Sequence, residues 1–291
     1  MTSSEFTSNR DNFCYRHPDR QSFALCQRCM RTICPECQTQ AAVGVICPEC
    51  MKAERQNRTP AQKKAARRWR GGGSAAIVRS GRPVVTYVLL AVTSFIGLLQ
   101  MIPGAGGVIT NALLFNSFFL DPRLFEPWRL LTAVFVHGGF IHLALNMLGL
   151  WMLGQTLEPM LGRARYLALY LISGLGGSVG VALIAPGTST VGASGAIFGL
   201  MAALLIIGRH IGANVTGILV ILGINLVYGF FVSGIAWQAH VGGLAIGALV
   251  AFLYTRTRRR EQRTIQIVWL SVITILLIVA ALVAGPLLLN A

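Results

Sequence analysis

Residues 191–208 read VGASGAIFGLMAALLIIG and residues 236–254 read AWQAHVGGLAIGALVAFLY, and these two stretches decide the fold. Neither contains a charged side chain, and at about 1.5 Å per residue each can span most of a hydrocarbon layer about 30 Å thick. Each also carries small residues at four-residue spacing, which allow membrane helices to approach each other closely. We therefore expect two helices that cross a membrane side by side.

The rest of the chain has the composition of a membrane protein. Its 291 residues are 54% apolar and 12% charged, which excludes a water-soluble globule. Further apolar stretches lie near 83–102, 135–157, 165–185, 213–232 and 266–289. Because helices satisfy their own backbone hydrogen bonds in lipid, the sequence predicts an all-α polytopic membrane protein with six core spans and one C-terminal span.

The positive charges predict how the chain is oriented. Ten Lys and Arg residues lie in 51–82 and five Arg residues lie in 256–263, whereas the loops on the opposite side hold Arg123 and Arg129. Since short basic segments stay on the cytoplasmic side, we expect a multi-pass cell-membrane protein with a cytoplasmic N-terminus and an extracytoplasmic C-terminus. The net charge of +15 then favours contact with anionic lipid on the cytoplasmic face. Nucleic-acid binding is disfavoured because aromatic residues are not interleaved with the charges.

The N-terminal region carries the pattern of a metal-binding module. All seven Cys residues and one His residue form four pairs with two residues between the members: Cys14/His17, Cys26/Cys29, Cys34/Cys37 and Cys47/Cys50. Each pair can reach one tetrahedral ion, so eight ligands predict two closed, structural Zn²⁺ sites. Disulfides are the alternative, but the odd number of Cys residues and a reducing compartment disfavour them.

The spacing of these pairs resembles the cross-braced zinc modules of the B-box type. The resemblance implies one site made of Cys14, His17, Cys34 and Cys37, and a second made of Cys26, Cys29, Cys47 and Cys50. Sequential pairing is the alternative. Since closed sites leave no position for a substrate, we expect the module to bind a protein partner.

The chain therefore divides into five predicted segments. They are a disordered tail at 1–13, a zinc-binding module at 14–50, a flexible basic linker at 51–82, a six-helix core at 83–255, and a basic loop with the seventh span at 256–291. The linker follows from Pro60, the Gly71–Gly73 run and dense Lys and Arg residues.

Polar residues inside the predicted spans are the candidate functional residues, because such groups are costly in lipid. Ser194 and His240 each lie roughly 21 Å above the cytoplasmic end of their spans, His142 roughly 22 Å and Asn146 roughly 16 Å. All four thus converge on one level, below the outer edge of the hydrocarbon core. His142 and Asn146 are four residues apart and share a helix face.

Ser194 and His240 have the chemistry of a nucleophile and its general base. Their helices are the two that small residues allow to approach, and Ser194 lies in the first turn of its helix, next to free N–H groups. No acidic residue lies in any predicted span, so the pair must act as a dyad without an orienting carboxylate. The Ser194 N–H, the Asn146 amide and His142 are candidate donors to an oxyanion.

The motifs around these residues resemble those of the rhomboid intramembrane serine proteases. The matching motifs are Trp128-Arg129, His137 with His142-Leu-Ala-Leu-Asn146, Gly192-Ala-Ser194-Gly195, and Ala239-His240-Val-Gly-Gly243-Leu-Ala-Ile-Gly247. The resemblance covers about residues 83–255 and implies Ser194 as nucleophile, His240 as base, and Asn146 with His142 around the oxyanion. It also places Gly192 beside the serine and Phe198 against the histidine, although tyrosine is commoner at that position.

The expected function is intramembrane proteolysis of other membrane proteins at or beside their transmembrane segments, with no cofactor for catalysis. Two alternatives belong to other classes of protein. A catalytically silent rhomboid-like scaffold or chaperone generally lacks the serine or the histidine, and both are present here. A transporter is expected to have charged or broken midplane helices in repeated halves, which this sequence lacks. Trp128 and Arg129 are expected to anchor the first loop, and Glu158 to form a loop ion pair or a helix-end contact.

Overall fold

The computed structural model describes residues 10–40, 44–57, 82–232 and 234–289. The chain divides into two compact units, Met1–Ala76 and Ile77–Ala291. We refer to the described residues of the first unit, 10–57, as the Cys/His module. Those of the second, 82–289, form the membrane unit.

The Cys/His module contains little regular structure. Strands β1 (Thr39–Gln40) and β2 (Val45–Ile46) pair antiparallel, and the 3₁₀ turns η1 (Arg10–Asn12) and η2 (Pro35–Cys37) precede them. Helix α2 (Pro48–Gln56) follows, with Pro48 in its first turn and the Cys47 sulfur accepting the Cys50 N–H. This helix extends past residue 50, where we expected the module to end, and η1 lies within the expected disordered tail. The rest of that tail and of the expected linker, 1–9 and 58–81, lie outside the described residues.

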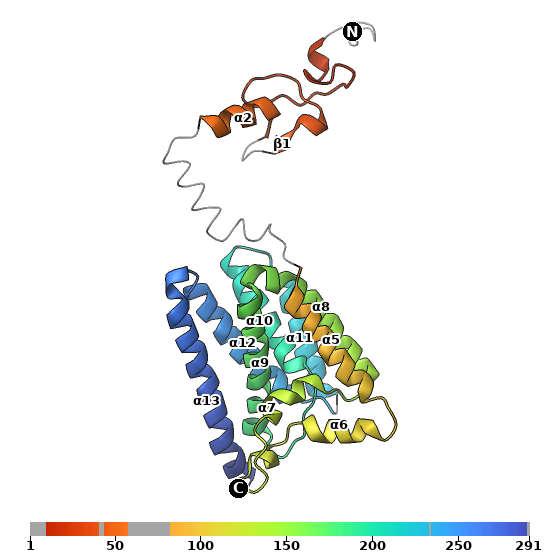
Figure 1. The fold of residues 1–291 in the computed structure, drawn as a ribbon, viewed down its shortest axis with the longest axis vertical. Helices are drawn as coiled ribbons and strands as arrows, with labels where there is room; N and C mark the ends of the chain where they lie inside the picture. Colours follow the sequence, from red (N-terminus) through yellow and green to blue (C-terminus); the bar gives the residue numbers. More distant parts are fainter. Residues whose placement is uncertain (1–9, 41–43, 58–81, 233, 290–291) are drawn as a thin grey trace. The chain divides into compact units, whose positions relative to one another are not determined.

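The membrane unit is a bundle of long apolar helices joined by short segments. The helices are α5 (Val84–Leu99), α6 (Ala105–Leu113), α7 (Arg129–Thr132), α8 (Phe140–Leu161), α9 (Arg163–Ile184), α10 (Ser194–His210), α11 (Thr216–Phe231), α12 (Trp237–Arg256) and α13 (Arg263–Leu289). Three 3₁₀ turns accompany them: η3 (Ser117–Leu120), η4 (Ala133–Phe135) and η5 (Arg260–Gln262). Helices α9, α10 and α12 lie between α13 on one side and α5 with α8 on the other (Figure 1).

Each predicted span corresponds to one long helix, which confirms the prediction of an all-α polytopic membrane protein. By length and composition, α8, α9, α12 and the segment Arg260–Val283 can cross a membrane, while α5, α10 and α11 are shorter apolar helices. One boundary differs clearly from the prediction, because the second span was expected at 135–157 and α8 begins at Phe140. Gly139 is the last residue of the non-helical segment before α8. Its φ of +139° is a backbone conformation that favours glycine.

Small residues set the distance between α10 and α12, as the sequence predicted. A methyl group added to Gly243 would overlap the carbonyl oxygen of Gly195, and one added to Gly247 would overlap Gly199. Helix α9 approaches α12 in the same way, since a methyl group on Gly180 would lie 2.6 Å from the carbonyl oxygen of Gln238. Three helix backbones thus meet where side chains are nearly absent, which fixes their spacing tightly.

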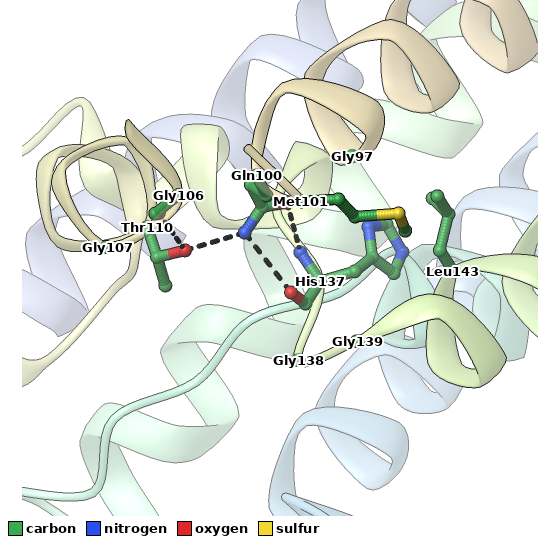
Figure 2. A pocket seen from close by; sticks show the side chains of 10 residues that line it. All are labelled: Gly97, Gln100, Met101, Gly106, Gly107, Thr110, His137, Gly138, Gly139 and Leu143. Atoms are coloured by element: carbon green, nitrogen blue, oxygen red, sulfur yellow. Dashed lines mark hydrogen bonds between the residues drawn. The ribbon is translucent and has the colours of Figure 1, made fainter. Parts of the chain in front are cut away.

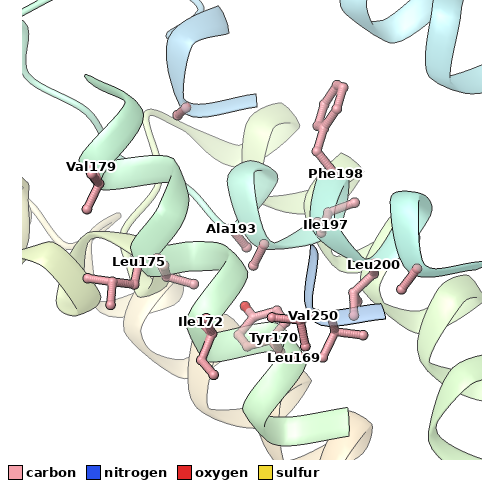
Figure 3. Close-up of a cluster of buried hydrophobic side chains, with 14 of the residues drawn as sticks. Leu169, Tyr170, Ile172, Leu175, Val179, Ala193, Ile197, Phe198, Leu200 and Val250 are labelled. Atoms are coloured by element: carbon pink, nitrogen blue, oxygen red, sulfur yellow. The ribbon is translucent and has the colours of Figure 1, made fainter. Parts of the chain in front are cut away.

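The larger side chains of the core lie along the same helices. Tyr170, Leu200 and Val250, from α9, α10 and α12 respectively, are fully buried in one cluster (Figure 3). Residues such as Ile224 on α11 and Leu276 on α13 are more than half exposed. Such exposed apolar faces suit a bundle whose solvent is lipid.

Candidate functional site

The Ser194 hydroxyl and the His240 imidazole meet at the ends of two helices. Ser194 is the first residue of α10, and His240 lies in the first turn of α12. The Ser194 Oγ is 2.9 Å from His240 Nε2, which is a hydrogen-bond distance between residues 46 positions apart. Close packing of α10 on α12 creates this contact, because the helices bring their first turns to the same level.

The His240 ring is held by packing rather than by an acid. Phe198, one turn after Ser194, stacks on the ring with centroids 4.2 Å apart and an angle of 11° between the planes. A methyl group added to Gly229 of α11 would lie 3.2 Å from His240 Nδ1, so α11 covers that edge of the ring. Among the described residues, His240 Nδ1 has no hydrogen-bond partner. The pair therefore has the geometry of a dyad.

His142 lies against the turn before Ser194, and Asn146 bonds to the His142 backbone. A methyl group added to Gly192 would lie 2.8 Å from His142 Nε2, so the imidazole lies directly against the Gly192 backbone. His142 Nδ1 accepts the Gly138 N–H at 3.3 Å, which leaves the proton of the neutral ring on Nε2, the nitrogen that faces Gly192. Asn146 is buried and donates one amide hydrogen to the His142 carbonyl oxygen at 2.8 Å. Its second amide hydrogen is available for another acceptor.

Arg129 anchors the first loop, as expected. Its side chain is 6% exposed, forms an ion pair with Glu126, and donates to the carbonyl oxygens of Asn111 and Leu114. Its guanidinium also lies 3.7 Å from the centre of the Phe119 ring. Through these contacts Arg129 holds the loop together.

Glu158 makes a helix-end contact, which is one of the two roles expected for it. Its carboxylate accepts the N–H groups of Val85 and Thr86, at 3.0 and 2.8 Å, and the Thr86 hydroxyl at 2.7 Å. The acid thus caps the first turn of α5 from the end of α8. The sequence did not reveal this partner, because the two residues lie 72 positions apart.

Two further polar residues near the site carry contacts that the sequence did not predict. His137, at the predicted membrane boundary, is 5% exposed and its Nε2 accepts the Ala193 N–H at 3.4 Å. Gln100, at the end of α5, bonds the backbone of His137. A polar amide at the end of an apolar span is the signal that could have singled out Gln100.

The Cys/His module brings its eight candidate ligands together in two clusters. Cys14, His17, Cys34 and Cys37 form one cluster, and Cys26, Cys29, Cys47 and Cys50 form the other. Within each cluster the ligand atoms lie within 4.8 Å of one another. This is the cross-braced pairing rather than the sequential one.

The donor geometry of both clusters fits a tetrahedral metal ion. The sulfurs of Cys29 and Cys47 are 3.8 Å apart, which equals the edge of a tetrahedron with Zn–S bonds of about 2.3 Å. His17 Nδ1 lies 3.3 Å from the Cys34 sulfur. None of the seven Cys residues forms a disulfide, so their sulfurs converge without a covalent link.

Backbone hydrogen bonds favour the thiolate form of Cys26, whereas burial raises the pKa of Cys37 and of Cys50. Burial raises the pKa of Cys26, but N–H groups from Cys47 and Cys29 stabilise its thiolate and lower the pKa to about 6. The Arg31 side chain donates to the Cys29 sulfur at 3.3 Å. Positive charge beside a four-thiolate site offsets part of the site's negative charge.

Comparison with known proteins identifies the family to which the chain belongs. The Rhomboid domain family matches residues 124–257. The rhomboid-family protein YdcA of Bacillus subtilis is 33% identical over 185 residues, which cover 62% of this chain and 92% of YdcA. The chain therefore belongs to the rhomboid family.

Other relatives are longer than this chain. The Rhomboid protease GluP of Bacillus subtilis is 39% identical over 189 residues, which cover 61% of this chain and 36% of GluP. The RHOMBOID-like protein 4 of Arabidopsis thaliana is 41% identical over 135 residues, or 44% of this chain and 34% of that protein. The matched region thus spans about a third of the length of each.

Proposed function

We propose that the chain is an intramembrane serine endopeptidase in which Ser194 is the nucleophile and His240 the general base. The distance of 2.9 Å between Ser194 Oγ and His240 Nε2 carries this proposal. Two residues from separate helices of a largely apolar bundle reach this distance. A packing role alone would not require that both be polar, because an apolar pair avoids the cost of desolvation.

The proposed reaction passes through an acyl-enzyme. His240 Nε2 takes the Ser194 proton as Oγ attacks the scissile carbonyl carbon, and the resulting imidazolium then protonates the leaving amine. A water molecule, deprotonated by His240, releases the new carboxyl end and restores the serine. Phe198 stacks on the imidazole and keeps the orientation of the ring during both proton transfers. This contact takes the orienting role that a carboxylate has in a triad.

The oxyanion of the tetrahedral intermediate is assigned to donors beside Ser194. These are the Ser194 N–H, the Nε2–H of His142 and the second amide hydrogen of Asn146. The hydrogen bond from Gly138 to His142 Nδ1 supports this assignment, since it selects the ring tautomer that donates toward Gly192. Such preorganised donors act strongly where water is scarce.

The proposed substrates are transmembrane segments of other membrane proteins. An α-helical peptide bond hides its carbonyl among side chains and intrahelical hydrogen bonds, so a substrate must unwind before Ser194 can attack. Segments with helix-breaking and small residues should therefore be preferred. Equal cleavage of an uninterrupted poly-Leu span would contradict this preference.

The basic segments support a cytoplasmic N-terminus and an extracytoplasmic C-terminus in the cell membrane. With this orientation the chain contacts anionic lipid on the cytoplasmic side. The two clusters of the Cys/His module are proposed to hold structural Zn²⁺, and the module to bind a protein partner. The ions have no part in the proposed reaction.

Labelling with a serine-directed fluorophosphonate tests the activity. The folded wild-type chain should be labelled and should cleave a transmembrane substrate in proteoliposomes. Ser194→Ala should abolish both signals, and His240→Ala should lower them by about 10²–10⁴-fold. Ser178→Ala on α9 is the matched control and should leave labelling unchanged.

The second candidate is a catalytically silent rhomboid-like scaffold that binds transmembrane helices. It predicts capture of a helix without labelling or cleavage, and equal capture by the wild type and Ser194→Ala. Absence of labelling in folded wild-type protein would favour this candidate and overturn the peptidase.

A further inference from the structure

The side chain of Gln100 ties together three segments beside the proposed active site. Its Nε2 donates to the His137 carbonyl oxygen at 3.1 Å, and its Oε1 accepts the His137 N–H at 2.9 Å. Nε2 also donates to the Thr110 hydroxyl of α6 at 2.7 Å (Figure 2). One amide thus joins the end of α5, helix α6 and the segment before α8.

We call these hydrogen bonds the Gln100 clamp. They replace hydrogen bonds that the backbone around His137 cannot make within its own segment. The segment between η4 and α8 is non-helical, contains Gly138 and Gly139, and borders a cavity of about 340 Å³. Backbone groups in such a segment need other partners, and the Gln100 amide satisfies both the N–H and the carbonyl of His137. The position of His137 therefore depends on Gln100.

The imidazole of His137 connects this segment to the nucleophile. Its Nε2 accepts the N–H of Ala193, the residue directly before Ser194, at 3.4 Å. The distance is long for a hydrogen bond, but the group is buried and removed from competing water. The ring also contacts His142 edge-on, with centroids 5.1 Å apart. His137 thus touches both sides of the proposed oxyanion site.

We propose that His137 is a positioning residue of the peptidase and that Gln100 positions His137. The proposal rests on the proposed function. The His137 acceptor fixes the Ala193 amide, which in turn sets the direction of the Ser194 N–H and hydroxyl. Gly192, with φ +115°, adopts a backbone conformation that favours glycine in the turn before Ser194.

A packing role alone would not select a histidine at this position. Among the described residues, His137 Nδ1 has no hydrogen-bond partner, so the buried ring leaves one polar atom unpaired. An apolar ring of similar size would fill the same space without that cost. The acceptor nitrogen at Ala193 is the feature that an apolar ring lacks.

Paired substitutions at His137 test the proposal in the full-length protein. His137→Phe keeps the size of the ring and removes the acceptor, so we expect kcat for a transmembrane substrate to fall about tenfold with little change in KM. The rate of fluorophosphonate labelling should fall by a similar factor. His137→Gln supplies an amide oxygen at a similar reach and should restore kcat to within about threefold. His210→Gln, at an exposed position on α10, is the matched control and should have no effect.

Gln100→Met keeps the length of the side chain and removes its hydrogen bonds to His137. Like His137→Phe, it should lower kcat while the chain remains folded. An unchanged kcat in His137→Phe or in Gln100→Met would overturn the proposal. Failure of His137→Gln to exceed His137→Phe in kcat, at equal thermal stability, would also overturn it. If the proposed peptidase function is wrong, the wild-type chain will neither cleave the substrate nor be labelled. That result is distinct from a failure of the positioning proposal.

Discussion

The Cys/His module and the membrane unit are held together in opposite ways. Five of the seven buried apolar residues of the module are the candidate ligands Cys14, Cys26, Cys34, Cys37 and Cys47, and the other two are Ile33 and Ile46. The core of the membrane unit is instead spread over many apolar side chains and over glycine contacts among α9, α10 and α12. The module is proposed to depend on two bound metal ions, whereas the membrane unit distributes its stability over many contacts.

Metal removal should produce the largest difference between the two units. A strong chelator should unfold the module, because structural Zn²⁺ sites contribute about 10–16 kcal/mol of folding free energy at neutral pH. The helical circular dichroism of the membrane unit should persist. Limited proteolysis and NMR of the full chain in detergent would follow each unit, and added Zn²⁺ should restore the module.

The double variant Cys26→Ala, Cys47→Ala tests the same difference without a chelator. It removes two ligands of one cluster, so that cluster should lose its metal and its local structure. Zinc-dependent structure retained by this cluster would contradict the assignment of its ligands.

The sequence predicted those features that depend on local spacing. Ligand pairs two residues apart identify the metal clusters, and small residues at every fourth position identify the close approach of α10 and α12. From these, the meeting of Ser194 and His240 could be expected before the structure was known. The choice between cross-braced and sequential ligand pairing needed the three-dimensional arrangement.

The sequence did not predict contacts that join distant segments outside a repeating pattern. Glu158 was expected to form a loop ion pair or a helix-end contact, but the sequence did not show that its carboxylate would cap α5, 72 residues earlier. The start of α8 was placed five residues too early, because apolar content does not reveal that the helix begins only after Gly139. The Gln100 clamp on His137 was missed for the same reason, since it depends on how α5 and the segment before α8 lie together.

A single methyl group should disturb the membrane unit most where helix backbones touch. Gly243→Ala places a methyl group on the Gly195 carbonyl, so α10 and α12 must separate. We expect a loss of about 1–3 kcal/mol in stability and at least tenfold in labelling rate, because the dyad spans these helices. Thermal unfolding in detergent and fluorophosphonate labelling would measure the two effects.

The matched control is Gly223→Ala on α11, where an added methyl group meets nothing within 4 Å. Its stability should stay within about 1 kcal/mol of the wild type. Equal losses in the two variants would mean that close helix contact does not hold this unit together.

Glu158→Gln should have a smaller effect on the site, because it weakens a polar contact near the opposite end of α8 from His142. The amide keeps one acceptor oxygen but cannot serve all three donors that the carboxylate accepts. We expect a loss of about 1–3 kcal/mol in thermal stability with little change in labelling per folded molecule. Glu261→Gln, at an exposed position, should change stability by less than about 0.5 kcal/mol.

Phe198 should give the smallest effect, confined to the chemistry of the site. The stacked contact with His240 is worth about 0.5–1.5 kcal/mol, so Phe198→Leu should lower kcat by about two- to tenfold. Phe198→Tyr keeps the stacked ring and should stay within about twofold of the wild type. Phe95→Leu, at an exposed position on α5, controls for the loss of an aromatic ring in the membrane unit. A Phe198→Leu variant with full kcat would show that α12 alone orients the imidazole, and that the dyad needs no aromatic support.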